Sequence, residues 1–337
     1  MKKGLIALLV GAMCFSMVAC SSSSSEAPAA EEEPAEEEAK APEETPEEPA
    51  AGESKGVIAL SLKTVTNDAF QAAQADAVQA AVEAAGYEFQ LVTAGSETEV
   101  STQVTQIEDL VTKGVDGIVI DPMDANAVLP AMQKAKDAGI PVVLTDSAVA
   151  EGNEDLYITY IGTDNYAAAK EGAEYLTEAL GNQGNVILVR GANGNSVGEA
   201  RANGYKDGLG DGITLAGEQP GDWSNDVAKQ VVENMLQANP DVAGIMTCSD
   251  VMLDGILEAC SDAGLEDVLI MSFDGSDDGL TYIKEGKVLG SMAQFPDVMG
   301  SKAVEILTGV IEGTVDPATV ESYIDSGTIC YNADNIK

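Results

Sequence analysis

The chain has 337 residues, a length that accommodates a substantial core and most naturally two domains. Its formal net charge of −40 argues against binding to nucleic acid or adsorption to anionic lipid, both of which require clustered lysine and arginine. The sequence contains no histidine, which excludes Ser-His-Asp and Cys-His catalytic sets and any metal site with a histidine ligand.

The five cysteines indicate neither a disulfide framework nor a zinc site, because their number is odd and no C-x-x-C spacing occurs. Cys14 and Cys20 lie near the N-terminus, and Cys248, Cys260 and Cys330 lie in the remainder of the chain. Pairing among the last three stays open. Cys260 falls on the apolar face of a predicted helix, where we expect simple packing.

Residues 1–20 have the pattern of a secretory signal peptide. Two lysines precede an apolar run from Leu5 to Val18, which is too short to span a membrane comfortably. Ala19 and Cys20, followed by five serines, resemble a bacterial lipobox. That resemblance implies lipidation at Cys20 and an extracytoplasmic protein anchored to the bacterial cell membrane. A plain cleaved signal with an incidental cysteine is the alternative.

Residues 21–55 form an acidic stretch rich in Glu, Pro, Ala and Ser. Positions 21–54 contain 12 Glu against one Lys, a charge of −11 for this segment alone. Such a composition cannot bury enough apolar surface to offset its ordering entropy, and like charges extend it. We therefore predict a disordered tether that holds the folded part away from a membrane.

From Gly56 onward, apolar strand-like runs alternate with helix-like runs that end in Gly or Asn-Pro. This alternation predicts an α/β fold with a mainly parallel sheet in each lobe. Strands are predicted at 57–62, 87–92, 115–120, 141–145, 157–161, 185–189, 213–216, 242–246, 268–273 and 288–293. Helices are predicted at 68–85, 97–113, 167–180, 197–209, 226–238, 279–285 and 297–312, with two more ending at Ala138 and Ala263.

Two segments, Val115–Ser147 and Val242–Ser276, repeat the same β-α-β pattern, and in each the second strand ends in Asp. This internal echo predicts two similar lobes. Ligands of open α/β sheets bind beyond the carboxyl ends of the strands. If the two lobes present these ends to each other, they form a cleft lined by Asp121, Asp146, Ser249, Asp250 and Asp274.

Carboxylates and amides at strand ends suit a small ligand with adjacent hydroxyls, since each group binds two hydrogen-bonding partners. Arg201 is the natural cation to offset them, because arginine is rare in this chain. Trp223, the only tryptophan, lies in a polar loop and indicates a contact surface. For any single aspartate, capping of the following helix is an equally good interpretation.

No enzyme signature is present, whether a phosphate-binding loop, a G-x-G-x-x-G motif or a nucleophile elbow. The segment Gly221–Asp226 lacks the ligand spacing of a calcium loop. The sequence therefore predicts a protein that is not an enzyme and that uses no cofactor or metal.

Eight stretches occur in an informative order: Thr66–Phe70 (TNDAF), Val115–Pro122 (VDGIVIDP), Gly139–Asp146 (GIPVVLTD), Ile161–Asn165 (IGTDN), Glu199–Tyr205 (EARANGY), Gln219–Trp223 (QPGDW), Phe273–Gly275 (FDG) and Ala293–Asp297 (AQFPD). In these, the chain from Gly56 to about Lys337 resembles the type I periplasmic sugar-binding proteins, the ribose- and galactose-type receptors of ABC importers. So many ordered matches are far more specific than any single motif.

The resemblance implies two Rossmann-like lobes that close around one sugar through a hinge of three crossovers, near 163–164, 294 and 323–324. The N-terminal lobe would comprise residues 56–163 and 295–323, and the C-terminal lobe residues 164–294 and 324–337. Asp250 would cap a helix. By motif position, the ligand-binding residues would be Asp68, Phe70, Asp121, Asp146, Ser147, Arg201, Trp223, Ser249, Asp274 and Gln294.

The chain departs from the ribose-type pattern at five of these positions or their neighbours. Gln71 stands where that group has a second aromatic, and Ser147 where it has an arginine. Asp68, Asp121 and Ser249 replace amide side chains. The pocket is therefore more acidic, and a different pentose, a hexose, a polyol or a ligand with a positive group would each fit.

The leading hypothesis is a monomeric, membrane-tethered protein that captures a sugar or polyol and delivers it to an ABC permease. The runner-up presents a sugar or autoinducer-type signal to a chemoreceptor or sensor kinase. A lipid-anchored hydrolase is disfavoured by the absence of histidine. The effector domain of a transcription regulator is disfavoured by the signal peptide and by the lack of a basic DNA-binding domain.

Overall fold

The computed structural model describes residues 54–66, 68–96, 98–265 and 267–336. The predicted signal peptide, the lipidation site Cys20 and nearly all of the acidic tether lie outside the described residues. Within the described part of the chain, no helix is long and apolar enough to cross a membrane.

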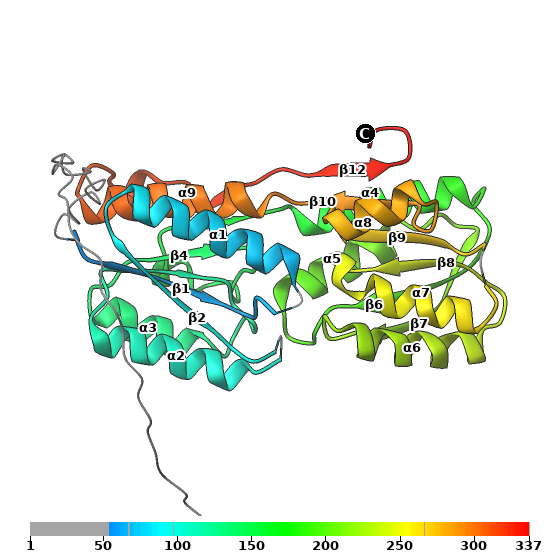
Figure 1. Ribbon diagram of the computed structural model, residues 1–337, viewed down its shortest axis with the longest axis horizontal. Helices are drawn as coiled ribbons and strands as arrows, with labels where there is room; N and C mark the ends of the chain where they lie inside the picture. The colour runs from blue at the N-terminus through cyan, green and yellow to red at the C-terminus, as the bar shows by residue number, and fades with distance from the viewer. Residues whose placement is uncertain (1–53, 67, 97, 266, 337) are drawn as a thin grey trace, which may run out of the picture. The chain divides into compact units, whose positions relative to one another are not determined.

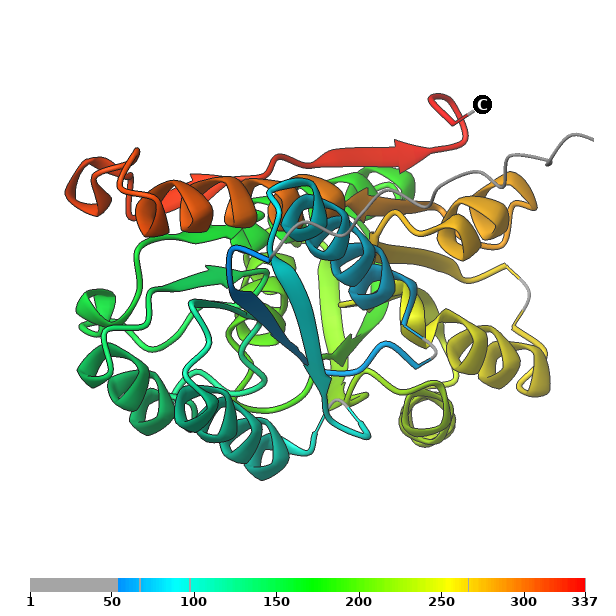
Figure 2. The same cartoon turned by 60° about the vertical axis from the view of Figure 1, so that its left-hand side comes forward.

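The first lobe, here called the N-lobe, contains a six-stranded sheet in the order β11-β5-β4-β3-β1-β2 (Figure 1). Its strands are β1 (Val57–Leu62), β2 (Glu88–Thr93), β3 (Gly117–Ile120), β4 (Val142–Thr145), β5 (Tyr160–Gly162) and β11 (Tyr323–Asp325). Its helices are α1 (Ala69–Ala84), α2 (Val100–Lys113), α3 (Leu129–Asp137) and α9 (Pro296–Ile311). Helices α1 and α9 lie side by side over one face of the sheet, as Figure 2 also shows.

The second lobe, here called the C-lobe, contains a six-stranded sheet in the order β12-β10-β9-β8-β6-β7. Its strands are β6 (Gly184–Arg190), β7 (Ile213–Pro220), β8 (Val242–Thr247), β9 (Leu269–Asp274), β10 (Gly290–Ala293) and β12 (Ile329–Asn332). Its helices are α4 (Asn165–Ala179), α5 (Ser196–Asp207), α6 (Asn225–Ala238), α7 (Leu253–Asp262) and α8 (Asp277–Lys284), with a 3₁₀ turn η2 (Asp250–Met252) before α7.

The two sheets have the same topology. Replacing β6 to β10 by β1 to β5, and β12 by β11, converts the second strand order into the first. Among the described pairs, all are parallel except β10 with β12. The predicted α/β fold with two similar lobes and mainly parallel sheets is thereby confirmed.

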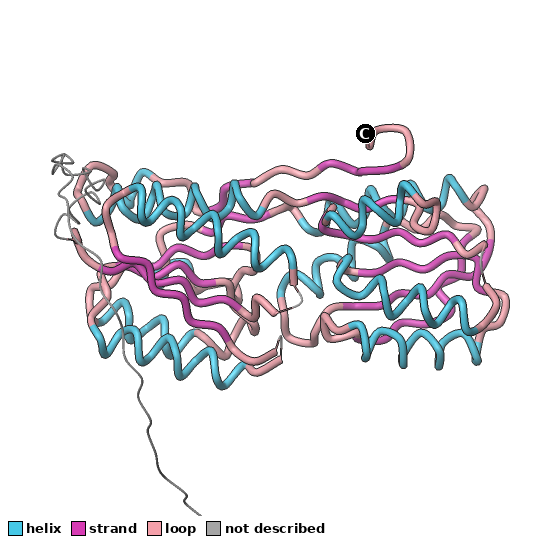
Figure 3. Tube along the Cα trace, viewed as in Figure 1, coloured by secondary structure: helices cyan, strands magenta, loops and turns pink. Residues whose placement is uncertain are grey.

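Burial explains why the apolar runs form strands. All residues of β3 and β4 are buried, as expected for parallel strands covered by helices on both faces. Figure 3 shows the strands of each lobe flanked by helices on both sides. Phe273 and Tyr205 are the largest fully buried side chains, both in the C-lobe core, and Cys260 is buried there as expected. Burying each such side chain contributes about 1.5–3 kcal/mol.

The chain passes between the lobes three times. It passes from β5 to α4, from β10 to α9, and from β11 to β12. The third passage follows Asp325, slightly later than the position that the resemblance implies, because Tyr323–Asp325 pairs with β5 of the N-lobe. Strands β11 and β12 have three and four residues and were not predicted as strands.

Candidate functional site

A small recess lies where the strand ends of the two lobes meet. It has a volume of about 30 Å³, roughly the share of one water molecule in the liquid. A wider outer pocket of about 620 Å³ adjoins it and shares four of its residues. The recess is lined by Lys63, Asp68, Phe70, Gln71, Asp146, Val197, Arg201, Trp223, Ser249, Val251, Asp274 and Gln294.

Eight of the ten residues named from the sequence line this recess. The other two, Asp121 and Ser147, lie behind its wall and are fully buried. Lys63 and Gln71 were not among the ten, although both line the recess and both organise it. The available signal for Lys63 was its position directly after the buried strand β1 in a chain with few cations.

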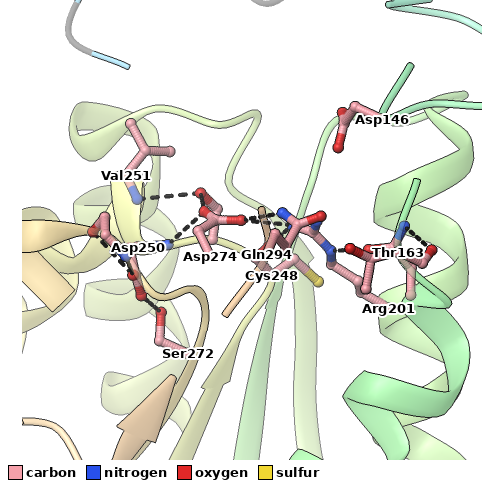
Figure 4. Close-up of polar contacts among 12 residues, drawn as sticks. Asp146, Thr163, Arg201, Cys248, Asp250, Val251, Ser272, Asp274 and Gln294 are labelled. Carbon is pink, nitrogen blue, oxygen red and sulfur yellow. Dashed lines mark hydrogen bonds and ion pairs between the residues drawn. The ribbon is translucent and has the colours of Figure 1, made fainter. Parts of the chain in front are cut away.

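Asp274, at the end of β9, is the centre of the C-lobe wall (Figure 4). Its carboxylate accepts hydrogen bonds from the Ser249 hydroxyl at 2.5 Å, the Gln294 amide at 2.7 Å and the Asp250 backbone N–H at 3.1 Å. Arg201 forms a salt bridge to it at 3.2 Å. Even so, burial raises the pKa of Asp274 above its ordinary value, with Arg201 as the largest opposing influence.

Arg201 projects from α5 and is 2% exposed. Besides Asp274, its guanidinium donates to the Asn165 side chain at 2.7 Å and to the Cys248 carbonyl at 2.7 Å. It also lies 3.7 Å from the centre of the Phe273 ring. A planar guanidinium suits this combination of a fork of acceptors and an aromatic face, which an ammonium group could not match.

Asp250 is held behind the wall by three serines, Ser272, Ser276 and Ser291. The expected role of Asp250 as a helix cap is wrong, because the Ser249 hydroxyl caps η2 by accepting from the Val251 N–H. Asp250 instead connects β9 and β10, through Ser272 and Ser291, with the start of α8 at Ser276. Burial, with the neighbouring Asp274 charge, raises its pKa.

In the N-lobe wall, Lys63 is the cation that forms ion pairs with aspartates, as Arg201 is in the C-lobe wall. Its ammonium group lies 2.8 Å from Asp146 and 3.2 Å from Asp121, and all three side chains are buried. The Gln71 amide donates to Asp121 at 2.7 Å. The Ser147 hydroxyl donates to Asp146 at 3.1 Å.

The two aspartates share the Lys63 charge unequally. Burial raises the pKa of Asp121 despite Lys63. Burial also acts to raise the pKa of Asp146, but the charges of Lys63 and Arg201 and the hydrogen bonds from Lys63 and Ser147 outweigh it, so the pKa falls below its ordinary value. Asp146 is therefore the carboxyl of the pair that loses its proton at lower pH, and it lines the recess.

Asp68 caps α1 at the mouth of the recess and accepts from the Gln71 N–H at 2.9 Å. Burial raises its pKa to about 6, because the backbone hydrogen bond and Lys63 offset only part of the effect, and Asp274 and Asp146 add to it. Asp68 thus adds a third carboxyl group to the lining of the recess, beside Asp146 and Asp274.

Strained backbone marks both walls. Asp146 has φ 57° and Asp274 has φ 108°, and Trp223 has φ 56°. Residues other than glycine rarely adopt positive φ, and such strain concentrates at functional sites. Asp146 directly follows β4 and Asp274 is the last residue of β9, and these two strands have equivalent places in the two sheets.

Phe70 and Trp223 supply apolar surface from opposite lobes. The Trp223 ring lies so close to Gly191 that a Cβ there would collide with it, which explains the glycine. Both rings are half-buried. Two aromatic faces and a ring of carboxylates and amides suit a ligand with apolar faces and a polar rim.

The lobes also contact each other directly beside the recess. The Asn195 amide of the C-lobe donates to the carbonyls of Pro122 and Met123 and to the Ser147 hydroxyl, at 3.3–3.4 Å. The Ala148 N–H donates to Ser196 at 2.9 Å. These contacts hold the two walls together in this structure.

Residues 58–314 match the family model described as the periplasmic binding protein domain. The chain is 31% identical over 261 residues to the ribose import binding protein RbsB of Salmonella typhimurium, a match covering 77% of this chain and 86% of the relative. It is 30% identical over 261 residues to the D-allose-binding periplasmic protein of Escherichia coli, covering 74% and 82%.

Comparison with solved structures agrees with these sequence matches. An ABC transporter solute-binding protein of Burkholderia graminis in complex with D-arabinose superposes with a TM-score of 0.76 at 30% identity, covering 84% of this chain and 96% of that chain. A periplasmic solute-binding protein of Actinobacillus succinogenes with bound D-allose has a TM-score of 0.76 at 27% identity, covering 83% and 98%.

Proposed function

The chain belongs to the type I periplasmic sugar-binding proteins of ABC transporters, and on this basis we propose that it captures a sugar-like molecule in the recess between its lobes. Members of this family are transport proteins that act outside the cytoplasm, and they are not enzymes. The proposal concerns the ligand, its site and its delivery.

The observation that carries the proposal is that Asp146 of the N-lobe and Asp274 of the C-lobe line one recess together with the Phe70 and Trp223 rings. Carboxylates bind adjacent sugar hydroxyls through two oxygens, and aromatic rings pack against the apolar faces of a sugar ring. Figure 4 shows the Asp146 carboxylate pointing toward the side of the site on which Arg201 and Gln294 lie. The proposed ligand contacts are the eight recess-lining residues predicted from the sequence, together with Lys63 and Gln71.

Movement of the lobes is part of the proposal. The recess has room for about one water molecule, so a sugar ring needs the walls to separate before it enters. Three chain passages connect the lobes, and such passages act as hinges when domains close around ligands. The Asn195 contacts would re-form when the lobes close on the ligand.

Thermal-shift screening over pentoses, hexoses and polyols tests the function. A ligand present at about 100 times its Kd should stabilise the folded state by about 2.7 kcal/mol, which raises the melting temperature. The Trp223→Ala variant should lose most of this shift. Tyr166→Ala is a matched control, because Tyr166 is 41% exposed and lies outside the recess. Absence of any shift across the panel would overturn the proposal.

Delivery to an ABC permease and anchoring through Cys20 complete the proposal. They are supported by the relatives named as import proteins and by the lipobox-like residues before the acidic tether. Mass spectrometry of the native N-terminus should find a lipid-modified Cys20, and a Cys20→Ala variant should be released from the membrane. An unmodified N-terminus on a protein that is not membrane-associated would refute the anchor, while co-purification with a sensor instead of a permease would refute the transport role.

A further inference from the structure

The buried atoms left without a hydrogen-bond partner in the recess are all acceptors, within the part of the chain that the structure describes. They are Oε1 of Gln71, Oδ1 of Asp146 and Oε1 of Gln294. The three side chains are 2%, 3% and 5% exposed, and they come from both lobes. A buried acceptor without a donor is unfavourable, so a ligand gains most by supplying donors.

The orientation of the two amides is fixed by their neighbours. The Gln71 nitrogen donates to the Asp121 carboxylate, and the Gln294 nitrogen donates to the Asp274 carboxylate. Turning either amide over would set oxygen against oxygen. The oxygen of each glutamine amide is therefore the atom without a hydrogen-bond partner among the described residues, so both oxygens are available to accept hydrogen bonds from a ligand.

The charged side chains around the recess also favour a ligand that donates hydrogen bonds. Asp68, Asp146 and Asp274 line the recess and Asp121 lies behind it, whereas Lys63 and Arg201 are the cationic side chains among its described lining residues. Carboxyl groups therefore outnumber cationic groups around the recess by four to two. The raised pKa of Asp68 is a consequence of burial and of this excess.

Within the described part of the chain, the outer pocket adds further carboxyl groups without adding a cationic side chain. It is lined by Asp68, Asp250, Asp254, Asp274 and Asp278, and no Lys or Arg is among its described lining residues. A pocket lined by one sign of charge focuses the field and concentrates oppositely charged ligands. Among the residues that the structure describes, no group of three or more His, Cys, Asp or Glu side chains is arranged to hold a metal ion.

Resting on the proposed function, we propose that the ligand is a polyhydroxylated molecule that carries a protonated amine, such as an amino sugar or an amino polyol. Its ammonium group lies between Asp68, Asp146 and Asp274. An ammonium group donates three hydrogen bonds and supplies a positive charge, whereas a hydroxyl donates one and supplies none. The remaining hydroxyls bind the two glutamine oxygens.

Isothermal titration with matched ligands tests this inference. The probes are 2-amino-2-deoxy and 6-amino-6-deoxy derivatives of D-glucose and D-galactose, together with 1-amino-1-deoxy derivatives of the corresponding hexitols, each beside its parent and its N-acetyl derivative. At least one amine should bind ten times more tightly than both neutral counterparts. N-acetylation removes the charge but keeps the nitrogen, so it separates charge from shape.

Asp68→Asn should reduce the ratio of amine affinity to neutral-parent affinity at least threefold, because it removes a negative charge from the recess lining. Asp76→Asn is the matched control, since Asp76 lies on the same helix, is exposed and does not line the recess. If every neutral parent binds more tightly than its amine, the proposal that the ligand carries an ammonium group is wrong, while the proposed sugar-binding function stands. Binding of neither class, in this panel and in the thermal screen, overturns both.

Discussion

The two walls of the recess are built on the same topology but neutralise their carboxylates differently. In the C-lobe, the planar guanidinium of Arg201 reaches an amide, a carbonyl and Asp274, and two further side chains donate to that aspartate. In the N-lobe, the single ammonium group of Lys63 lies between Asp121 and Asp146. Arg201 forms an ion pair with one aspartate, whereas Lys63 forms ion pairs with two buried aspartates.

This difference assigns different tasks to the walls. Asp274 has its donors in place before a ligand arrives, so the C-lobe wall is preorganised. Asp146 keeps one buried oxygen without a donor, so the N-lobe wall is completed by what the ligand brings. The N-lobe wall should accordingly be the more sensitive of the two to loss of its cation.

The largest expected effect comes from Lys63→Met. Two buried carboxylates lose their shared cation, which should cost about 5 kcal/mol, the upper end of the range for breaking a buried ion pair. Urea unfolding at pH 7 measures the loss. Adding Asp121→Asn to Lys63→Met should recover a large part of it. A loss below about 1 kcal/mol would show that Lys63 does not neutralise the pair.

Arg201→Ala should cost less, about 3 kcal/mol, at the lower end of the same range. Asp274 keeps its donors from Ser249 and Gln294, and only one carboxylate loses its cation. Arg201→Lys is the control, since it keeps the charge but loses the fork. If Arg201→Ala proved more damaging to unfolding free energy than Lys63→Met, the contrast between the walls would be wrong.

Asp68→Asn should change how stability depends on pH. Because the folded-state pKa of Asp68 is raised to about 6, the folded protein holds this proton more tightly than the unfolded chain, and the resulting stabilisation is lost as pH rises through 6. Since the side chain is half-buried, the wild type should lose only about 1–2 kcal/mol more than the variant between pH 4 and pH 7. Asparagine caps helices as well as aspartate does. If urea unfolding showed the same pH dependence of the unfolding free energy for the wild type and for Asp68→Asn, this prediction would be contradicted.

The smallest effect concerns the contacts between the walls. Asn195→Ser should retain the cap that Asn195 provides to the Gly198 N–H but lose the donors to the N-lobe. Affinity for the ligand found by screening should weaken by about 1 kcal/mol, with the unfolding free energy unchanged. Asn195→Ala should additionally lose about 1 kcal/mol of stability with the cap. Unchanged affinity in both variants would show that the Asn195 contacts do not contribute to closure of the lobes around the ligand.

Much of the fold followed from local patterns in the sequence. Buried apolar runs and glycine-terminated helices predicted the order of elements from β1 to α9, and the repeat of Val115–Ser147 in Val242–Ser276 predicted the equivalence of Asp146 and Asp274. Short edge strands escaped prediction because Tyr323–Asp325 and Ile329–Asn332 are partly exposed and owe their form to pairing with distant strands.

The site was harder to predict in its details, because hydrogen bonds between distant residues carry no local signal. Arg201 meets Asn165 and the Cys248 carbonyl across separations of 36 and 47 residues. Lys63 was missed because a lysine after a strand is usually solvated. Only the folded sheet, with β1 adjacent to β3, brings it between Asp121 and Asp146.

The central claim is that the walls carrying Asp146 and Asp274 bind the ligand between them. Isothermal titration of the ligand found by the thermal screen into wild-type and Asp274→Asn protein tests it most directly. Asparagine tolerates positive φ and keeps the shape of the side chain, but it cannot accept hydrogen bonds on both of its terminal atoms. We predict that binding weakens at least tenfold in the variant. Equal affinity in both proteins would mean that the ligand binds elsewhere.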